Sequence, residues 1–587
     1  MTPSLLSLLK DQIDIPRVPF SDRGSRLLVF QNGGRSSLHI KLAERLTRID
    51  PGIETYLNRP PFISDLVFID EKGELLDFKV STSPEVLRFH TRLGVLELVF
   101  QNENTIAIGI PERTTVGIRF RVRPTHWRRT NFGGEINYVR GVAYRVHNGD
   151  VIGNKLRSDD KNNASIVEFV VQAQKDCFIT LQIADELDSR PEKLLFEGVR
   201  ENAENRWREW FHSAPSVGEI YRQKYAYAWW VMANNLISPS GYVKYEAMMP
   251  TKAFYVGVWL WDSALHAIAF RHIDAELARN QIRVMLAHQL PDGMLPDVVF
   301  DDGIVTEIDH PIHGLVTKPP ILAWSALKIH ETDPNVDFLR EIYDPLVRCH
   351  TWWFDHNADD KDGLVLYQHP YSSGLDDSPL WDHGMPVKSP DINTYLHKQM
   401  NALAGIAEMI GKPKDAEAWR QKAKELLARM IENLWDEEAG LFRAKYNDTW
   451  IPVITPFSLY PLWTGELPQE ITARLLAHLK DTSMFWGEFG LPTVAYTDPA
   501  FNPDKMWRGP TWANVNYFFV EALKNIGEHE LANELRDKTL NLIASQPDIR
   551  EYYNSQSGIP PRTAAPIFGW SAAVFIDLLL MNHTENK

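Results

Sequence analysis

The segment DAEAWRQKAKELLARMIENLW, residues 415–435, carries a clear helical pattern. Its apolar residues recur every three or four positions and therefore lie on one face of a helix. They are Trp419, Ala423, Leu426, Leu427, Met430 and Leu434. Periods of this kind dominate from about residue 197 onward, so we predict that the second part of the chain is all-α.

Residues 26–185 follow another pattern, in which short β-rich runs alternate with turn signals. Examples are LGVLELVF (93–100), TIAIGI (105–110) and SIVEFVVQA (165–173). Runs of this length and spacing are typical of an antiparallel sandwich. We therefore predict three parts: a β-sandwich-like domain over 1–190, a charged linker helix over 191–215 and a helical domain over 216–587.

Six glycines, each followed by an apolar residue, recur through the helical part at intervals of roughly 50 to 80 residues. They are Gly241, Gly293, Gly363, Gly440, Gly490 and Gly558. A helix that closes on glycine, a turn and a return helix make one helical hairpin. Six hairpins around an axis form an (α/α)6 barrel; an open solenoid is the alternative.

The composition excludes several classes of partner. The net charge of −15 argues against nucleic acid, since the one basic cluster, RVRPTHWRRT (121–130), is short. No apolar stretch reaches the ~18 residues that a membrane span needs. Only Cys177 and Cys349 occur, and the N-terminal residues lack the pattern of a secretion signal, so we expect a reducing cytoplasm. The sequence does not indicate an oligomeric state.

No cofactor or metal is expected from the motifs. Neither a phosphate-binding glycine loop nor a tight histidine spacing for zinc occurs. The stretch NADDKDG (357–363) is similar to a calcium loop, but Ala358 stands where the first ligand would be. We interpret it as a solvated turn.

The stretch SSGLDDSPLWD, residues 372–382, holds three aspartates and no basic residue. Asp377 and Asp382 either cap a following helix or act on Asp376 electrostatically. Like charges and the apolar Trp381 both disfavour ionisation of Asp376. A carboxyl group kept protonated in this way is suited to general acid catalysis.

At these residues the chain resembles the inverting (α/α)6-barrel glycosidases of glycoside hydrolase family 63, and more distantly the trehalases of family 37. The matching motifs lie between residues 254 and 573: W-x-W-D at 259–262, S-G-x-D-x-S at 373–378, W-R-G-P-x-W at 507–512, E-x-Y-N-x-x-x-G at 551–558 and FGWSAA at 568–573. Each motif is weak by itself, but all of them occur in the same order as in these families, which makes the resemblance specific.

The resemblance implies site residues. Asp376 corresponds to the general acid and Glu551 to the base that activates water. The residues that correspond to a sugar pocket are Tyr255, Trp259, Trp261, Asp262, Lys318, Trp381, Trp507, Arg508 and Trp512. Leu375 departs from the family pattern, which has an aromatic residue there. Lys318 replaces a polar amide, so we expect a cation facing an anionic aglycone such as a carboxylate.

The predicted function is cofactor-free, inverting, exo-acting hydrolysis of a small α-glucoside, an oligosaccharide or other glycoside. Inversion needs an acid and a base on opposite faces of the sugar, which distant Asp376 and Glu551 can supply. A mannosyl- or glucosylglycerate hydrolase and a trehalase-like enzyme are alternatives within the same chemistry. Phosphorolysis, epimerisation and a non-catalytic carbohydrate-binding protein are alternatives of other classes.

Overall fold

The computed structural model describes residues 4–45, 60–188 and 194–585. Its contacts divide the chain into two compact units. The first consists of Met1–Ser238 with Lys252–Val256, and the second of Pro239–Thr251 with Gly257–Lys587. In the described part, no helix is long and apolar enough to cross a membrane.

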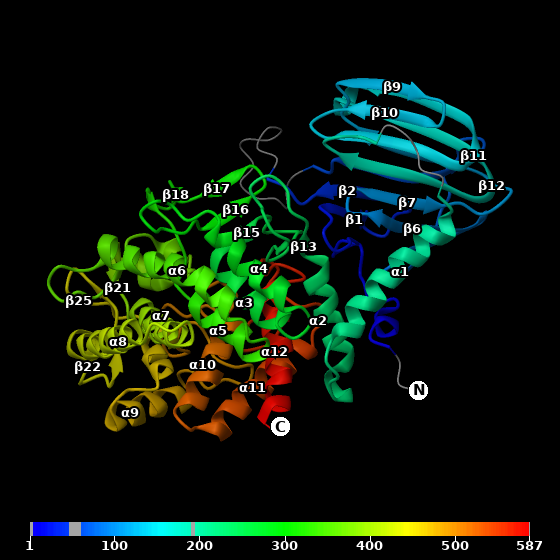
Figure 1. The fold of residues 1–587 in the computed structure, drawn as a ribbon. Helices are drawn as coiled ribbons and strands as arrows, with labels where there is room; N and C mark the ends of the chain where they lie inside the picture. Colours follow the sequence, from blue (N-terminus) through cyan, green and yellow to red (C-terminus); the bar gives the residue numbers. More distant parts are fainter. Residues whose placement is uncertain (1–3, 46–59, 189–193, 586–587) are drawn as a thin grey trace. The chain divides into compact units, whose positions relative to one another are not determined.

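The first unit is built on a twelve-stranded sheet whose neighbouring strands run antiparallel (Figure 1). Its strands are β1 (Leu27–Gln31), β2 (Leu38–Leu42), β3 (Ile63–Asp70), β4 (Lys79–Ser83), β5 (Val86–Thr91), β6 (Gly94–Asn102), β7 (Thr105–Gly109), β8 (Thr115–Val122), β9 (His126–Thr130), β10 (Gly133–Asn137), β11 (Gly141–Asp159) and β12 (Ala164–Ala184). The all-β prediction for this part is confirmed.

The expected two sheets of a sandwich are replaced by one continuous sheet. The run SIVEFVVQA (165–173) and a second β-rich run, CFITLQI (177–183), belong to the single 21-residue strand β12. Its first part pairs with β8, from Ser165 to Gln172, and its second part pairs with β7, from Phe178 to Gln182. One long strand therefore hydrogen-bonds to both groups of shorter strands and joins them.

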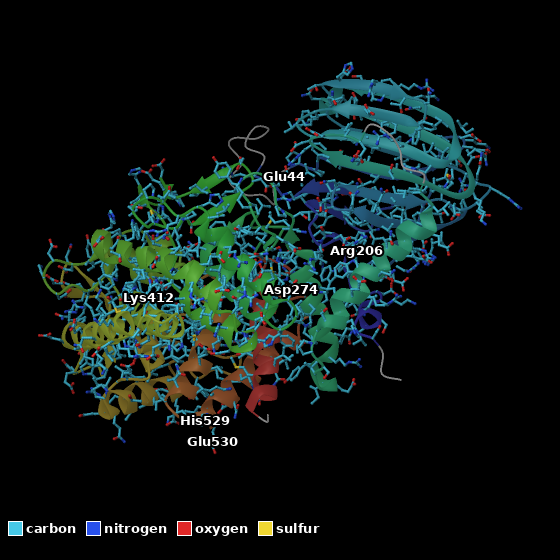
Figure 2. The ribbon with its side chains drawn as sticks, in the orientation of Figure 1. Glu44, Arg206, Asp274, Lys412, His529 and Glu530 are labelled. Carbon is cyan, nitrogen blue, oxygen red and sulfur yellow. The ribbon has the colours of Figure 1, made fainter. Side chains whose placement is uncertain are left out.

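Helix α1 (Phe196–Ser213) contributes to the core of the first unit. Its Val199 and Ala203 pack with Phe178 and Val99 of the sheet. Arg206 of the same helix donates hydrogen bonds to the Asp22 carboxylate and to the backbone of the sheet (Figure 2). The expected charged linker thus has a buried apolar face.

Helix α2 (Arg222–Asn234) also clusters with the first unit. Trp229 of α2 accepts a hydrogen bond at its carbonyl from the Trp210 indole of α1, and the two rings meet edge to face. The boundary between the two units consequently lies near Ser238. The change of periodicity in the sequence had placed the start of the helical domain at residue 216.

The second unit is mainly helical, as predicted. Its helices are α3 (Leu260–Phe270), α4 (Ala275–Leu286), α5 (Leu322–Thr332), α6 (Val336–Asn357), α7 (Pro390–Met409), α8 (Pro413–Leu434), α9 (Gln469–Lys480), α10 (Ala513–Asn525), α11 (His529–Ala544), α12 (Gly569–Glu585) and the 3-10 helices η5 (Pro370–Ser373), η6 (Pro379–His383) and η7 (Pro456–Thr464). Short strands lie in the loops: β15 (Val258–Trp259), β16 (Val298–Phe300), β17 (Gly303–Val305), β18 (Glu307–Ile308), β19 (Gly314–Leu315), β20 (Leu366–Tyr367), β21 (Val387–Lys388), β22 (Trp435–Asp436), β23 (Leu441–Phe442), β24 (Lys445–Tyr446) and β25 (Thr449–Trp450).

Six of these helices contact one another in a closed order. Going round the ring, α3 packs on α5, α5 on α7, α7 on η7, η7 on α10, α10 on α12, and α12 returns to α3. A second set packs against this ring: α4 on α3, α6 and α8 on α7, α9 on η7, and α11 on α10. Pro461 lies within the ring element η7, which is a 3-10 helix, and proline has no backbone N–H to donate to an α-helical hydrogen bond.

The six recurring glycines all have positive φ, between 56° and 101°. They differ from the expectation in one respect, because they do not end the helices directly. Gly363, for example, lies beyond the end of α6 at Asn357, and Gly440 beyond the end of α8 at Leu434. Five of them lie in the loops that follow the outer helices α4, α6, α8, α9 and α11, and Gly241 lies in the loop that follows α2.

Side-chain caps mark the starts of two outer helices. Asp274 accepts a hydrogen bond from the Leu277 amide at α4 (Figure 2), and Asn335 accepts one from the Phe338 amide at α6. Both fill the unsatisfied amides that every helix N-terminus exposes.

Candidate active site

Asp376 lies in a tightly built loop between η5 and η6. Gly374 ends η5 with φ of 73°, and a Cβ atom at this position would lie 2.4 Å from the indole ring of Trp261. The Trp381 indole nitrogen donates to the Leu375 carbonyl at 2.7 Å and braces the other side of the loop. The backbone on both sides of Asp376 is therefore fixed by tryptophan contacts.

The surroundings of the Asp376 carboxyl group shift its pKa upward. Its Oδ1 is buried and makes no hydrogen bond with any described residue, while the side chain as a whole is 36% exposed. Burial raises the pKa of Asp376 and the adjacent Asp377 raises it further, against the opposing effect of the Lys318 ammonium. The net direction is upward, which is the direction that a general acid requires.

Lys318 is the basic group that the stretch 372–382 lacks. It is buried in the loop before α5, and its Nζ lies 3.1 Å from Asp297 Oδ1 and 4.0 Å from Asp376 Oδ1. The same Nζ donates a hydrogen bond to the Tyr371 carbonyl at 2.5 Å. Its charge is therefore compensated by protein groups, which differs from the expected cation turned toward an aglycone.

Asp297 is a site residue that the sequence did not single out. It precedes β16, which pairs with β15 so that Val298 lies opposite Trp259. The Asp297 carbonyl accepts from the Leu260 amide at 3.0 Å, at the start of α3. An aspartate directly after proline in the loop QLPDGMLPDVV was the signal available in the sequence.

Asp262 lies in the first turn of α3 and is 4% exposed. Burial raises its pKa to about 8, with Asp297 and Asp376 adding to the rise and Lys318 opposing it. Burial likewise raises the pKa of Asp297, to about 6, although Lys318 lowers it. The Lys318 ammonium therefore lowers the pKa of all three carboxyl groups, Asp262, Asp297 and Asp376. The sequence could not show this arrangement.

Glu551 is held by the segment that leads into α12. Its Oε2 accepts from the Ala565 amide at 3.1 Å, and its own amide donates to the Ala565 carbonyl at 3.0 Å. The next residues pair with the start of α10 through Thr511 and Tyr553. Glu551 is 3% exposed, and the Ala565 amide orients its carboxylate.

A stack of aromatic rings links the loop of Asp376 to the segment of Glu551. Asp377 accepts the Trp507 amide at 2.8 Å, Trp507 stacks on Trp512 at 3.7 Å, and Trp512 stacks on Tyr552, the neighbour of Glu551. Burial raises the pKa of the Tyr552 phenol, and the charges of Glu551 and Asp377 raise it further. The loop of Asp376 and the segment of Glu551 therefore meet at one place in the fold.

Comparison with known proteins identifies the family. The model of the mannosylglycerate hydrolase MGH1-like glycoside hydrolase domain matches residues 255–571, which is more than half of the chain. The chain belongs to glycoside hydrolase family 63. It is a glycoside hydrolase, and the alternative of a non-catalytic carbohydrate-binding protein is set aside.

Individual relatives of this family 63 enzyme act on glycosylglycerates according to their names. The mannosylglycerate hydrolase of Thermus thermophilus is 27% identical over 56% of this chain and 95% of its own length. The glucosylglycerate hydrolase of Mycolicibacterium hassiacum is 25% identical over 55% and 92%. A bacterial glucoamylase complexed with acarbose covers all of this chain and 96% of its own, with a TM-score of 0.57 at 12% identity, and so shares the fold.

Asp382 and Arg508 of the family 63 enzyme form a bidentate ion pair in which Nη1 lies 2.8 Å from Oδ2. Neither Asp377 nor Asp382 caps a helix, because Ser378 is the N-cap of η6. The expectation that Asp382 acts on Asp376 as an unneutralised charge is therefore wrong. Arg508 comes from a segment remote in sequence, which local composition could not reveal.

The predicted pocket tryptophans of the enzyme are buried to different degrees. Trp261, Trp507 and Trp512 are at most 3% exposed and pack on one another or on the Asp376 loop, whereas Trp259 is partly exposed. Tyr255 belongs to the segment Lys252–Val256, which clusters with the first unit, where its ring packs against Phe254 at 4.6 Å.

Two of the three aspartates of NADDKDG are paired with a lysine. Lys388 Nζ lies 2.7 Å from Asp359 and 2.5 Å from Asp362. Across the described residues, no group of three or more His, Cys, Asp or Glu side chains is arranged to hold a metal ion.

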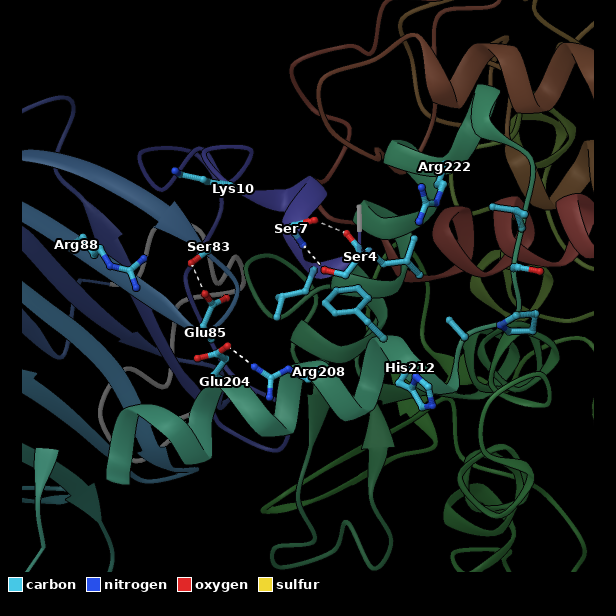
Figure 3. Close-up of a pocket in the computed structure, with 17 residues that line it drawn as sticks. Ser4, Ser7, Lys10, Ser83, Glu85, Arg88, Glu204, Arg208, His212 and Arg222 are labelled. Atoms are coloured by element: carbon cyan, nitrogen blue, oxygen red, sulfur yellow. Dashed lines mark hydrogen bonds and ion pairs between the residues drawn. The ribbon is translucent and has the colours of Figure 1, made fainter. Parts of the chain in front are cut away.

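A cavity of about 690 Å³ lies within the first unit (Figure 3). It is lined by η1 (Leu6–Leu9), the β4–β5 turn, and α1 with the segment after it. Its charged groups are partly paired, as in Ser83 with Glu85 and Glu204 with Arg208. None of the predicted site residues lines it, so we assign it no part in hydrolysis.

Proposed function

We propose that the protein is an inverting, exo-acting hydrolase of a small α-glucoside, with Asp376 as general acid and Glu551 as the base that activates water. The observation that carries the proposal is the Asp376 carboxyl group, which combines an oxygen without a hydrogen bond in the described part, a raised pKa and access to solvent. Glu551 fits the second role because the Ala565 amide orients its carboxylate.

In the proposed reaction, Asp376 gives its proton to the glycosidic oxygen as the bond to the anomeric carbon breaks. Glu551 accepts a proton from a water molecule that attacks this carbon from the opposite face. The products are a sugar of inverted configuration and the free aglycone alcohol. Asp262 and Trp259 are proposed to bind the sugar, since both lie beside the Asp297 end of β16.

A glucosyl- or mannosylglycerate is the second candidate substrate, and the names of the relatives support it. Its carboxylate would bind most strongly to a cation whose charge is not already compensated by protein groups. The engagement of Lys318 by Asp297 and Tyr371 therefore favours a neutral aglycone.

Further assignments accompany this proposal. The closed order of α3, α5, α7, η7, α10 and α12 supports the inner ring of an (α/α)6 barrel within a catalytic domain over 216–587. Cys177 and Cys349 are buried free thiols, which is compatible with a reducing cytoplasm.

The test compares Asp376→Asn and Glu551→Gln with the unchanged enzyme on α-glucobioses, trehalose, glucosylglycerate and mannosylglycerate. We expect each variant to lower kcat by about 10² to 10⁴, the usual contribution of a general acid or base. Proton NMR during the first turnovers should show the β-anomer of the released sugar. Release of the α-anomer, or near-normal kcat in either variant, would contradict the proposal.

The two roles can be separated by leaving group. α-Glucosyl fluoride needs little help from an acid because fluoride leaves readily, so Asp376→Asn should hydrolyse it at close to the normal rate. Glu551→Gln should remain impaired, because water must still be activated. Equal losses in both variants would show that the roles are assigned wrongly.

A separate assay without phosphate distinguishes hydrolysis from phosphorolysis. Omitting phosphate should leave all rates unchanged if the reaction is hydrolysis.

A further inference from the structure

Four titratable side chains interact with one another at the proposed acid. They are Lys318, Asp297, Asp262 and Asp376 itself, with Asp377 next to it on the same loop. We propose that Lys318, held by Asp297, is a positioning residue that sets the pH range over which Asp376 keeps its proton. The inference rests on the proposed function, in which Asp376 is the general acid.

The position of Lys318 is determined by more than one contact. Its Nζ is closer to Asp297, at 3.1 Å, than to Asp376, at 4.0 Å. The hydrogen bond to the Tyr371 carbonyl ties the ammonium to η5, the element that leads into the Asp376 loop. The ring of Trp259 lies 5.9 Å from the same nitrogen. The ammonium is thus held near Asp376 but not bonded to it.

Asp297 is anchored independently of Lys318. Its amide donates to the Val305 carbonyl at 2.8 Å and its carbonyl accepts from Leu260 at 3.0 Å, so the small sheet of β15, β16 and β17 holds its backbone. The side chain is 1% exposed. A buried carboxylate in this place keeps the ammonium on its own side of the cluster.

The electrostatic consequence has a definite sign. A full positive charge beside Asp376 would favour its carboxylate form and remove the proton that catalysis needs. Asp297 offsets that charge, and the adjacent Asp377 raises the pKa of Asp376 as well. Asp376 therefore experiences a weakened cation, and the net result is a raised pKa.

The experiment measures kcat/KM against pH, whose alkaline limb reports loss of the acid's proton from the free enzyme. The probe is the disaccharide or glycosylglycerate of the panel that is cleaved fastest, because its alcohol leaving group requires the acid. Asp297→Asn should move the alkaline limb to lower pH by about one unit, since the freed ammonium then acts on Asp376. Lys318→Gln should move it by about one unit to higher pH.

The opposite signs make the test specific. If Lys318 and Asp297 had a purely structural role, both variants would react more slowly, but their alkaline limbs would not shift in opposite directions. In the double variant Asp297→Asn/Lys318→Gln both charges are absent, and we expect a limb close to that of the unchanged enzyme. Asp297→Ser repeats the removal of charge with a smaller side chain, in case Asp297→Asn does not fold.

Lys388 offers a matched control. It is also a buried lysine held by two aspartates, but it pairs with the turn at 359–362. Lys388→Gln should leave the alkaline limb in place even if it lowers the thermal stability. A shift equal to that of Lys318→Gln would overturn the inference by showing that any buried lysine has this effect.

The outcomes separate the inference from the proposed function. If the limb is unmoved in both Asp297→Asn and Lys318→Gln, or moves in the same direction in both, the inference is wrong. The proposed function still holds in that case, provided that Asp376→Asn abolishes the limb. If Asp376→Asn retains the limb, Asp376 is not the acid and both fall together.

Discussion

At the scale of the residue, Gly374 shows how closely the site depends on its supports. Its φ of 73° belongs to the left-handed region, where a side chain is strained. The missing Cβ leaves room for the edge of the Trp261 ring, which would otherwise lie 2.4 Å away. The glycine therefore allows a rigid indole to support the loop of the proposed acid.

Gly374→Ala should lower kcat by about 10 to 100-fold, because the loop must move away from Trp261 and misplaces Asp376. The measurement is steady-state hydrolysis, with circular dichroism to confirm folding. Gly411→Ala is the matched control: φ is 82° there, and none of the described heavy atoms lies within 4 Å of the added Cβ. It should cost about 1 to 2 kcal/mol of stability through backbone strain and leave kcat unchanged. Equal kcat losses in both variants would refute the steric argument.

At the scale of the elements, Asp577 joins three helices of the ring. Its buried carboxylate on α12 contacts Arg271 at 2.9 Å and His272 at 2.7 Å, both just beyond α3, and accepts from Tyr517 of α10 at 2.7 Å. Burial alone would raise the pKa of Asp577, but Arg271, His272 and Tyr517 outweigh it and hold the pKa well below the ordinary value. The last helix is thereby tied to the first helix of the ring.

Asp577→Asn should lower the free energy of unfolding by about 3 kcal/mol, because Arg271 is left buried without this counterion. Since the folded pKa of Asp577 is depressed, its contribution is complete above about pH 5 and is lost as the pH falls below the ordinary aspartate value of about 4. Urea denaturation at several pH values checks both points, and the Asp577→Asn variant should lose less stability on acidification than the unchanged enzyme.

Asp337→Asn is the control. It removes the exposed ion pair with Arg340 and should lower the free energy of unfolding by less than about 1 kcal/mol. A comparable cost in both variants would contradict this account.

At the scale of the whole molecule, the chain forms two units that each have their own core. The core of the first unit includes Val99, Phe178 and Val199. The second unit contains the ring of helices with Asp577. Proteins built from several such units often unfold in more than one transition.

Scanning calorimetry of the full chain should therefore show that substitutions act on separate parts of the thermal profile. Val99→Ala removes two buried methyl groups, costs about 2 kcal/mol, and should shift the transition of the first unit. Asp577→Asn should shift the transition of the helical unit. One transition that moves equally in both variants would show that the chain unfolds as a single cooperative whole.

The sequence by itself determined the class of each half and the segments that carry the proposed acid and base. Helical or alternating periodicity is a property of about a dozen neighbouring residues. The strands β6 and β7 and the helix α8 form where this periodicity predicted them. The motifs around Asp376 and Glu551 are equally local.

Only the tertiary structure decided how these segments combine. The single sheet depends on two pairings along β12, and the ring depends on the contact of α12 with α3. The charge balance of the site was also invisible in the sequence: Arg508 reaches Asp382 across 126 positions of the chain, and Lys318 meets Asp297 and Asp376 from a third loop. Electrostatic interactions act over a few ångströms of space, so the partners of a charge are set by which distant segments the fold brings together.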